Sequence, residues 1–343
     1  MEEFRIPSDM APGKINNLIE LARIAGVSTS TVSRALSGKG ALNDTTRQRI
    51  RAIAERHGFQ VDAKAQNLRL GRTGTIGIIL PLGHEKEQHV SDPFFMAILA
   101  LLADEISDRG YDLLFRRIDP EGSEWLNRIL ETKRVDGLLI IGQSDQGEVL
   151  ERVGKGYKPL AVWGQGEPNQ SYTTVGVDNV AGGRLAAKHL LERGRTRLAY
   201  FGNVGLPEFR ARYDGFLSAL PAHVKGMTEL VSIHMTSHAS HAAALDFLRD
   251  HPDTDGIFAA SDVTALSVIR GAVESGRRVP EDISVIGFDD VPLAGYSNPP
   301  LTTIRQDLER GARAMCDIVF ARLDGETRNS VRLSPELIVR ASS

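Results

Sequence analysis

The chain has 343 residues, of which 41% are hydrophobic and 25% charged, and its net charge is −3. This length allows two or three domains with sizeable cores. No apolar run reaches the length of a membrane span, the first residues show no secretory signal, and the single Cys316 excludes an intramolecular disulfide. We therefore expect a cytoplasmic protein without a membrane partner, and no motif indicates a cofactor or a metal site.

The charge is unevenly distributed along the chain. Residues 14–72 contain 11 Lys and Arg against 4 Asp and Glu, a net charge of +7. Residues 73–343 contain 29 against 37, a net charge of −8. A basic N-terminal segment on an acidic body is typical of a nucleic-acid-binding module joined to a second domain.

After a poorly ordered lead-in at residues 1–14, residues 15–60 are expected to form a helix-turn-helix DNA-binding domain of three helices. Gly26 allows the sharp turn between the first two helices, and Ser28 is a natural N-cap for the second. Asn43 or Asp44 caps the third helix. The first helix is indicated by apolar residues at helical spacing, namely Leu18, Leu21, Ala22 and Ala25.

The second helix has two distinct faces. Its inner face carries Val32, Ala35 and Leu36. Its outer face consists of short hydroxyl side chains and one guanidinium, which suit a helix that enters the major groove: Thr29, Ser30, Ser33 and Arg34. An ordinary amphipathic surface helix shows the same pattern, so this stretch alone leaves both interpretations open.

Residues 61–73 form a short, polar, alanine-containing stretch that can become helical. An isolated helix of this length is marginal in water, so it orders only against a partner. A plain linker is the alternative interpretation.

Residues 74–343 change character, because apolar, β-branched runs now alternate with helical patterns. The expected strands are Ile76–Leu80, Asp112–Phe115, Val135–Ile141, Leu160–Trp163, Thr173–Val177, Leu198–Phe201, Leu230–Ile233, Gly256–Ala259 and Ile283–Phe288. The expected helices include Ala97–Asp108, Gly182–Glu192, Tyr213–Leu220, Ala242–Arg249 and Thr264–Glu274. This alternation predicts doubly wound parallel sheets in two similar lobes, with a ligand cleft between them.

Short motifs in a fixed order resemble the LacI/GalR family of bacterial transcriptional regulators, from about Leu18 to Arg340. They are Ala25–Ser28 with Thr31–Arg34, Thr46-Arg47, Ala65–Leu68, Thr75–Gly77, Val135–Gly137, Val177–Asn179 with Gly182-Gly183, Arg210–Arg212 with Gly215-Phe216, Val285–Asp290 and Pro300–Ile304. The resemblance implies an α + α/β fold: a three-helix head, a hinge helix at residues 61–73, and two doubly wound lobes of the periplasmic-binding-protein type.

The resemblance also implies that the chain crosses three times between the lobes of this effector-binding and dimerisation core. By analogy the crossings fall near Val175, Ile304 and Asn329. The expected N-lobe therefore spans about 74–175 plus 305–329, and the C-lobe about 176–304 plus 330–343.

In this family the head contacts DNA, so the resemblance assigns DNA roles to named residues. Thr29 and Ser30 occupy the positions that set base preference, and Arg34 also reaches base edges. Leu68 matches the hinge leucine that is wedged into the minor groove, and Ala65 belongs to the same motif. Contacts to phosphate are expected from Ser28, Thr31, Ser33 and Asn43.

Other positions match the effector site of the family. Arg212 and Asp289 match an arginine and a carboxylate that suit the hydroxyl groups of a sugar, with Asp290 as the rival carboxylate. Phe94 is expected to stack on a sugar face, whereas Phe95 is assigned to the core. Further expected contacts are Trp163, for which a buried packing role is the alternative, Gln165 and Ser261.

Two neighbouring features complete this expectation. Asp262 is expected to cap the helix that follows it, and Ser261 stands where many relatives have an asparagine. Residues 83–91 are longer and more polar than a simple loop, which is typical of a lid. Their histidines, His84 and His89, show no ligand spacing for a metal.

The sequence thus predicts a repressor of carbohydrate-utilisation genes, whose operator binding is controlled by a mono- or disaccharide in the cleft. Paired hinge leucines require a homodimer on a palindromic operator, and no leucine heptad follows Arg340 to make a tetramer. The alternative is a transport-type sugar-binding protein without a DNA function. An enzyme is disfavoured, because no nucleophile with a base, phosphate loop or metal set is present.

Overall fold

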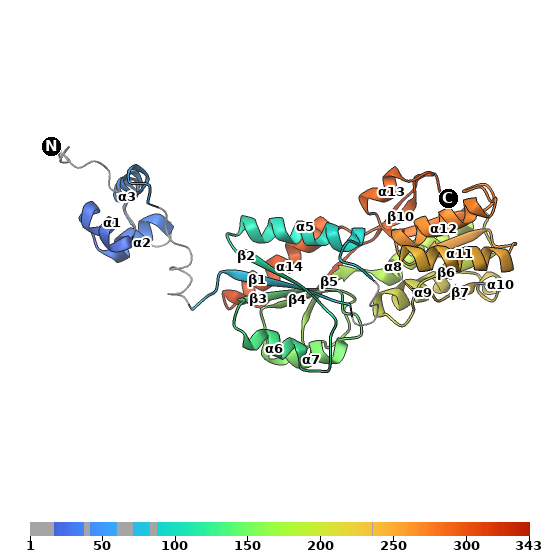
Figure 1. The fold of residues 1–343 in the computed structure, drawn as a ribbon, viewed down its shortest axis with the longest axis horizontal. Helices are drawn as coiled ribbons and strands as arrows, with labels where there is room; N and C mark the ends of the chain where they lie inside the picture. The colour runs from blue at the N-terminus through green and yellow to red at the C-terminus, as the bar shows by residue number, and fades with distance from the viewer. Residues whose placement is uncertain (1–16, 38–41, 60–70, 83–87, 235) are drawn as a thin grey trace. The chain divides into compact units, whose positions relative to one another are not determined.

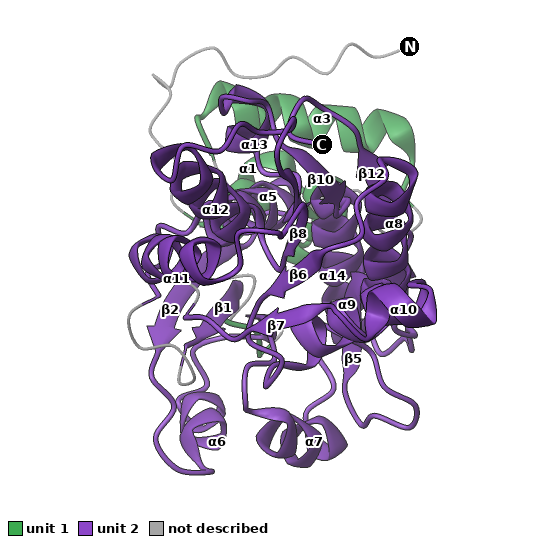
Figure 2. Cartoon of the chain, turned by 90° about the vertical axis from the view of Figure 1, so that its right-hand side faces the viewer, with its two compact units in different colours: residues 1–73 green, residues 74–343 purple. Residues whose placement is uncertain are grey.

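The computed structural model describes residues 17–37, 42–59, 71–82, 88–234 and 236–343. The chain folds as two compact units, residues 1–73 and residues 74–343, which Figure 2 colours separately. Among the described residues, no helix is both long and apolar enough to cross a membrane.

The first unit contains the helices α1 (Leu18–Ala25), α2 (Thr29–Ser37) and α3 (Asp44–Arg56) (Figure 1). Asn17 caps α1 by accepting a hydrogen bond from the Glu20 amide, and Asn43 caps α3 through the Thr45 amide. Gly26 has a φ of 65°, which the turn between α1 and α2 requires. The expected helix-turn-helix is confirmed.

Two arginines of α3 hold the other two helices in place. Arg49 donates to the carbonyl of Ala25 at 3.0 Å, and Arg51 donates to the carbonyl of Ala35 at 3.2 Å. Both carbonyls lie in the last turn of their helix, where a cation also interacts favourably with the helix dipole. The core beneath these contacts consists of Leu21, Ala22, Ala25, Val32, Ala35, Ile50 and Ala54.

The second unit consists of two α/β lobes, each built on a six-stranded sheet. The sheet of the first lobe has the order β11-β5-β4-β3-β1-β2, and all its strand pairs are parallel. Its strands are β1 (Thr75–Pro81), β2 (Asp112–Ile118), β3 (Gly137–Ile141), β4 (Leu160–Trp163), β5 (Thr173–Val177) and β11 (Val331–Leu333). One face is covered by α5 (Pro93–Asp108) and α14 (Leu308–Leu323), the other by α6 (Trp125–Glu131) and α7 (Gly147–Gly156) (Figure 1).

The second lobe repeats this plan with the strand order β12-β10-β9-β8-β6-β7 and one antiparallel pair, β10 with β12. Its strands are β6 (Leu198–Phe201), β7 (Glu229–Val231), β8 (Gly256–Ala259), β9 (Ser284–Asp289), β10 (Thr302–Arg305) and β12 (Glu336–Ile338). Its helices are α8 (Asn179–Glu192), α9 (Pro207–Ser218), α10 (Ala222–Lys225), α11 (Ser237–Asp250), α12 (Asp262–Glu274) and α13 (Pro292–Tyr296). α8 and α9 pack on one face of the sheet, α11 and α12 on the other.

The chain passes between the two sheets at three places, after Val177, Arg305 and Leu333. The first two lie within two residues of the expected crossings. The third was expected near Asn329, with residues 330–343 in the second lobe, and this is wrong for β11. Val331 pairs with Val175 of β5, so β11 belongs to the first lobe. A three-residue strand has too little pattern to reveal its sheet, which only its partner determines.

Several helices begin earlier than their apolar pattern predicted. α5 was expected from Ala97 and begins at Pro93, after the N-cap Asp92, whose side chain accepts a hydrogen bond from the Phe94 amide. α9 was expected from Tyr213 and begins at Pro207. Proline suits the first helical turn because its fixed φ matches the helix and its missing N–H is not needed there.

Candidate functional site

Helix α2 and the residue before it present an exposed surface rich in hydroxyl groups. Ser28, Thr29, Ser30 and Arg34 are exposed, while Ser33 is half-buried. Because one guanidinium and several hydroxyls face outward from a rigid helix, this face is suited to contacts with base edges and phosphates.

Ser28 organises the start of α2. Its Oγ accepts a hydrogen bond from the amide of the half-buried Thr31 at 3.2 Å. The same Oγ lies 2.8 Å from the hydroxyl of Ser30 and 2.9 Å from that of Thr31. Asn43, exposed at the start of α3, is occupied as an N-cap. The expected hinge residues Ala65 and Leu68 lie outside the described residues.

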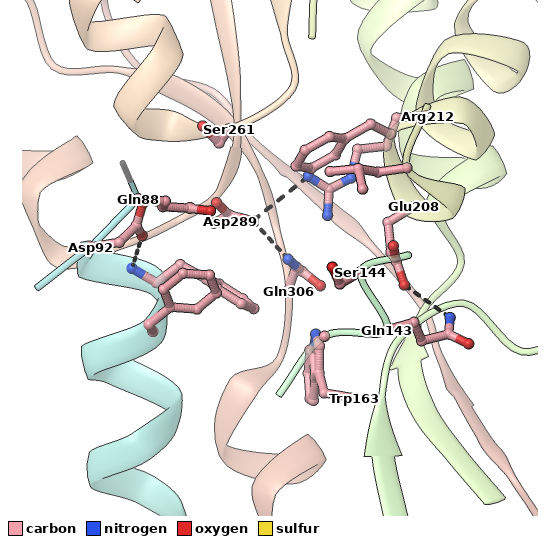
Figure 3. Close-up of a pocket in the computed structure, with 15 residues that line it drawn as sticks. Gln88, Asp92, Gln143, Ser144, Trp163, Glu208, Arg212, Ser261, Asp289 and Gln306 are labelled. Carbon is pink, nitrogen blue, oxygen red and sulfur yellow. Dashed lines mark hydrogen bonds and ion pairs between the residues drawn. The ribbon is translucent and has the colours of Figure 1, made fainter. Parts of the chain in front are cut away.

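A cleft between the two lobes encloses about 690 Å³, including its opening to solvent (Figure 3). This is within the usual range of small-molecule sites. Its walls come from both sheets and from α5 and α9. The lining residues are Gln88, Asp92, Phe94, Phe95, Gly142, Gln143, Ser144, Trp163, Leu206, Glu208, Phe209, Arg212, Ser261, Asp289 and Gln306.

Arg212 of α9 is buried in the wall of this cleft, with 5% of its surface exposed. Its Nε donates to the side-chain oxygen of Asn179 at 2.9 Å, and its Nη1 donates to the carbonyl of Ala260. Its guanidinium carbon lies 3.6 Å from the ring centroid of Phe288, a cation–π contact. Burial lowers the pKa of Arg212, and the nearby Asp289 opposes this shift.

β9 ends at Asp289, and the backbone is kinked at Asp289 and Asp290, with φ values of 123° and 58°. Residues other than glycine rarely adopt such conformations, and they cluster at functional sites. The kink turns the two carboxylates apart: Asp289 lines the cleft, while Asp290 pairs with Arg305 at 2.7 Å and Arg340 at 2.6 Å. The structure thus places Asp289, and not Asp290, on the cleft wall.

The environment of Asp289 is unusual for a carboxylate. Its Oδ1 accepts a hydrogen bond from Nε2 of Gln306 at 2.7 Å and lies 4.0 Å from Nη1 of Arg212. Figure 3 shows both side chains pointing toward it. Burial raises the pKa of Asp289 to about 7, although Arg212 and Gln306 act in the opposite direction.

Aromatic side chains form the opposite part of the wall. Phe94 and Trp163 lie with ring centroids 6.2 Å apart, and Phe95 packs edge-on against Phe94 at 5.7 Å. Phe95, which was assigned to the core, lines the cleft as well. Trp163 is 4% exposed; it lines the cleft and also packs in the core against Gly311 of α14.

Ser261, and not Asp262, caps helix α12. Ser261 is the N-cap and accepts from the Thr264 amide at 3.2 Å, so the expectation that Asp262 caps the helix is wrong. Asp262 is fully buried and accepts from the Thr303 hydroxyl at 2.5 Å and the Val291 amide at 2.9 Å. Ser261 lines the cleft, whereas Asp262 joins α12 to the sheet.

Gln165 lies behind the cleft and is not among the residues that line it. Its side-chain oxygen accepts from Asn179 at 3.0 Å, and Asn179 in turn accepts from Arg212. Gln165 therefore supports Arg212 through Asn179. The sequence placed it in the cleft because it closely follows a buried strand, but its side-chain oxygen is taken up by Asn179.

Several lining residues were not predicted. Gln143 and Ser144 follow β3, and Gln306 follows β10, so polar residues directly after a parallel strand were the available signal. Glu208 lies in the first turn of α9, and it was missed because the predicted helix began only at Tyr213. The other unpredicted polar lining residues are Gln88 and Asp92.

Comparison with known proteins agrees with this architecture. Residues 17–62 match the family described as bacterial regulatory proteins, lacI family, and residues 187–343 match the periplasmic binding protein-like domain. The chain is 32% identical over 331 residues to the HTH-type transcriptional regulator CelR of Thermobifida fusca, covering 94% of this chain and 96% of that protein. It is 30% identical over 336 residues to the HTH-type transcriptional repressor PurR of Aliivibrio fischeri, and the match covers 94% of this chain and 97% of that protein.

A solved structure of a transcriptional regulator CelR–cellobiose complex resembles this fold with a TM-score of 0.68 and 29% identity. The match covers 96% of this chain and all of that one, so it includes the head and both lobes. With its helix-turn-helix, its two periplasmic-binding-protein-like lobes and relatives of this length and identity, the chain belongs to the lacI family of bacterial transcriptional regulators.

Proposed function

We propose that this regulator is a repressor of carbohydrate-utilisation genes, and that a mono- or disaccharide bound in the cleft controls its affinity for a palindromic operator. The observation that carries this proposal is the combination of the buried Arg212 and Asp289 with the aromatic Phe94 and Trp163 around one cleft. The guanidinium donates to sugar oxygens, the carboxylate accepts from sugar hydroxyls, and the rings contact the apolar face of a sugar. The relative that was solved with cellobiose supports a sugar as the ligand class.

The cleft wall provides a route by which a ligand changes the lobes. Gln88, Phe94 and Trp163 belong to the first lobe, whereas Arg212, Ser261 and Asp289 belong to the second. A sugar that contacts both sets of residues favours one relative orientation of the lobes over others. A bound sugar therefore changes the affinity for the operator, and a bound operator changes the affinity for the sugar by the same free energy.

On the DNA side, we propose that Thr29, Ser30 and Arg34 contact bases and that Ser28, Thr31, Ser33 and Asn43 contact phosphates. All of them are exposed or half-buried on α2, just before it or at the start of α3, which supports their access to DNA. Ala65 and Leu68 complete the proposed interface from the hinge. A head of three short helices makes a small interface, so two copies of the chain on two half-sites are needed for a specific affinity.

The homodimer has candidate apolar surface outside the head. Large apolar side chains are exposed on several elements of the two lobes, and those on α13 stand out most, with Leu293 51% and Tyr296 87% exposed. We expect light scattering to give a dimer; a tetramer would contradict the proposal.

Intrinsic fluorescence tests the sugar proposal, because the sequence has two tryptophans and only Trp163 lines the cleft. Trp125 is buried elsewhere and donates to Gln146 at 2.7 Å. A saturable fluorescence change with one member of a panel of mono- and disaccharides, lost in Trp163→Phe, is the expected result. Purines and amino acids serve as negative controls. A panel in which only a purine or an amino acid binds would contradict the sugar effector.

A further inference from the structure

Glu208, in the first turn of α9, connects the two lobes across the cleft. Its Oε1 accepts a hydrogen bond from the side-chain amide of Gln143 at 2.9 Å and from the backbone amide of Gln165 at 3.0 Å. Both donors belong to the first lobe, since they follow β3 and β4, whereas α9 belongs to the second lobe. Figure 3 shows Glu208 and Gln143 facing each other at the edge of the cleft.

The position of Glu208 is fixed by its surroundings. The hydroxyl of Tyr172 donates to the side-chain oxygen of Gln143 at 2.5 Å, which leaves the amide nitrogen of Gln143 directed at Glu208. Burial raises the pKa of Tyr172, so its hydroxyl keeps the proton it donates. A Cβ at Gly164 would lie 2.7 Å from both Gln143 and Oε1 of Glu208, so the glycine leaves room for this bridge. A carboxylate held in this way has little freedom to swing away from a bound ligand.

Acidic side chains outnumber basic ones among the described residues that line the cleft. Asp92, Glu208 and Asp289 are carboxylates, and Arg212 is the one cationic side chain among the described lining residues. Arg212 is already engaged by Asn179, Ala260 and Asp289. Both hydrogen bonds that Glu208 accepts within the described residues go to Oε1, so Oε2 is left as an acceptor.

This arrangement discriminates between ligands by their charge. Sugar hydroxyls and ammonium groups are hydrogen-bond donors, which fixed carboxylates accept. A phosphate is an anion without donors when fully ionised, so a carboxylate that cannot move away repels it in a partly desolvated cleft. Like charges held together in this way are a common means of rejecting the wrong partner.

We propose that Glu208 is a specificity-determining residue that makes the cleft select unphosphorylated sugars and reject sugar phosphates. This inference rests on the proposed sugar effector and names the class of sugar that the site takes. The hydrogen bonds between the lobes fix the position of Glu208, and its charge, held in that position, excludes anions.

Calorimetric titration of the full chain tests this inference. The probes are ribose, glucose, cellobiose and lactose, with ribose 5-phosphate, glucose 6-phosphate and cellobiose 6′-phosphate as phosphorylated counterparts. We expect the wild-type protein to bind a neutral sugar at least about tenfold more tightly than its phosphate. Glu208→Gln keeps an oxygen that can accept from Gln143 and Gln165 but removes the charge, and we expect it to reduce this ratio by about tenfold.

Glu229→Gln is the matched control, because it removes the same charge from an exposed position on β7 of the second lobe. It should leave the ratio of affinities unchanged, and thermal melting should show that both variants fold. A sugar phosphate that binds wild type as tightly as its neutral counterpart would overturn the inference, and so would a ratio unaffected by Glu208→Gln. If no sugar or sugar phosphate binds either protein, the proposed sugar effector fails, and the inference fails with it.

Discussion

Nη1 of Arg212 and Oδ1 of Asp289 lie 4.0 Å apart in the cleft wall, and neither side chain is more than 7% exposed. At this distance the two charged groups attract each other, but they form no direct hydrogen bond. Each is instead held by neutral neighbours, Arg212 by Asn179 and Asp289 by Gln306. The pair is thus prepared to bind polar groups that reach into the cleft.

The first prediction concerns pH. The pKa of Asp289 is raised in the folded protein to about 7, so the folded state holds the proton more tightly than the unfolded chain. The contribution to stability is fully present below the ordinary pKa of 3.8 and is lost as the pH rises through about 7. Asp289→Asn should therefore flatten the fall in the free energy of unfolding between these values, measured by urea titration at several pH values. If the free energy of unfolding falls with pH equally in wild type and variant, Asp289 is not the titrating group.

The same variant should weaken the binding of a neutral sugar by about tenfold, because it replaces a charge-assisted acceptor with a neutral amide. Calorimetry at pH 8 measures this loss. Asp290→Asn is the matched control, since Asp290 pairs with Arg305 and Arg340 away from the cleft. An equal effect of both substitutions on sugar affinity would contradict the assignment.

The second prediction concerns Asn179, which accepts from Arg212 and donates to Gln165. Asn179→Ala leaves the Nε of Arg212 without this buried acceptor, which should lower the free energy of unfolding by about 1–3 kcal/mol and weaken sugar binding. Asn179→Asp retains the acceptor and should rescue the sugar affinity. If Asn179→Ala binds sugar normally, Arg212 does not depend on this support.

The third prediction concerns Gly311 of α14, which lies beneath the ring of Trp163. Gly311→Ala places a methyl group against the ring and should shift the emission of Trp163, with a destabilisation of about 1–3 kcal/mol. Gly147→Ala in α7 is the control, because a Cβ there meets no atom within 4 Å. Unchanged emission in Gly311→Ala would contradict the packing of Trp163.

The fourth prediction concerns the exposed Arg34 of α2. Arg34→Ala should reduce specific DNA affinity by about 1–3 kcal/mol and relax the preference at one base pair of each half-site, as measured by selection from a pool of random duplexes. Arg23→Ala, on the exposed side of α1, removes the same charge and should leave base preference unchanged. A uniform loss of affinity with intact preference would assign Arg34 to phosphate instead.

The sequence predicted the large elements because their patterns are local. The helices of the head have apolar residues at helical spacing, strands such as Leu160–Trp163 are continuous apolar runs, and both agree with the structure. β11 and β12 escaped prediction because three-residue strands are defined by their partners. The early start of α9 at Pro207 was missed since its first turn is polar, and Glu208 was missed with it.

The cleft residues show the same division. Arg212, Asp289, Phe94 and Ser261 were predicted from the family resemblance and Trp163 from its place at the end of a strand, and all of them line the cleft. The roles of Gln165 and Asp262 could not be predicted, because they depend on hydrogen bonds to residues distant in sequence. The choice between the adjacent Asp289 and Asp290 depended on backbone angles that the residue types do not reveal.

The most direct test measures sugar and DNA together. A fluorescently labelled operator duplex, obtained by the selection described above, is titrated with the full-length protein in the absence and presence of the sugar identified by fluorescence. The account predicts that the sugar changes operator affinity by about 5–150-fold in wild type. In Arg212→Lys the operator should still bind, but the sugar should no longer change its affinity. An operator affinity that is the same with and without a sugar saturating the cleft would contradict the proposed function.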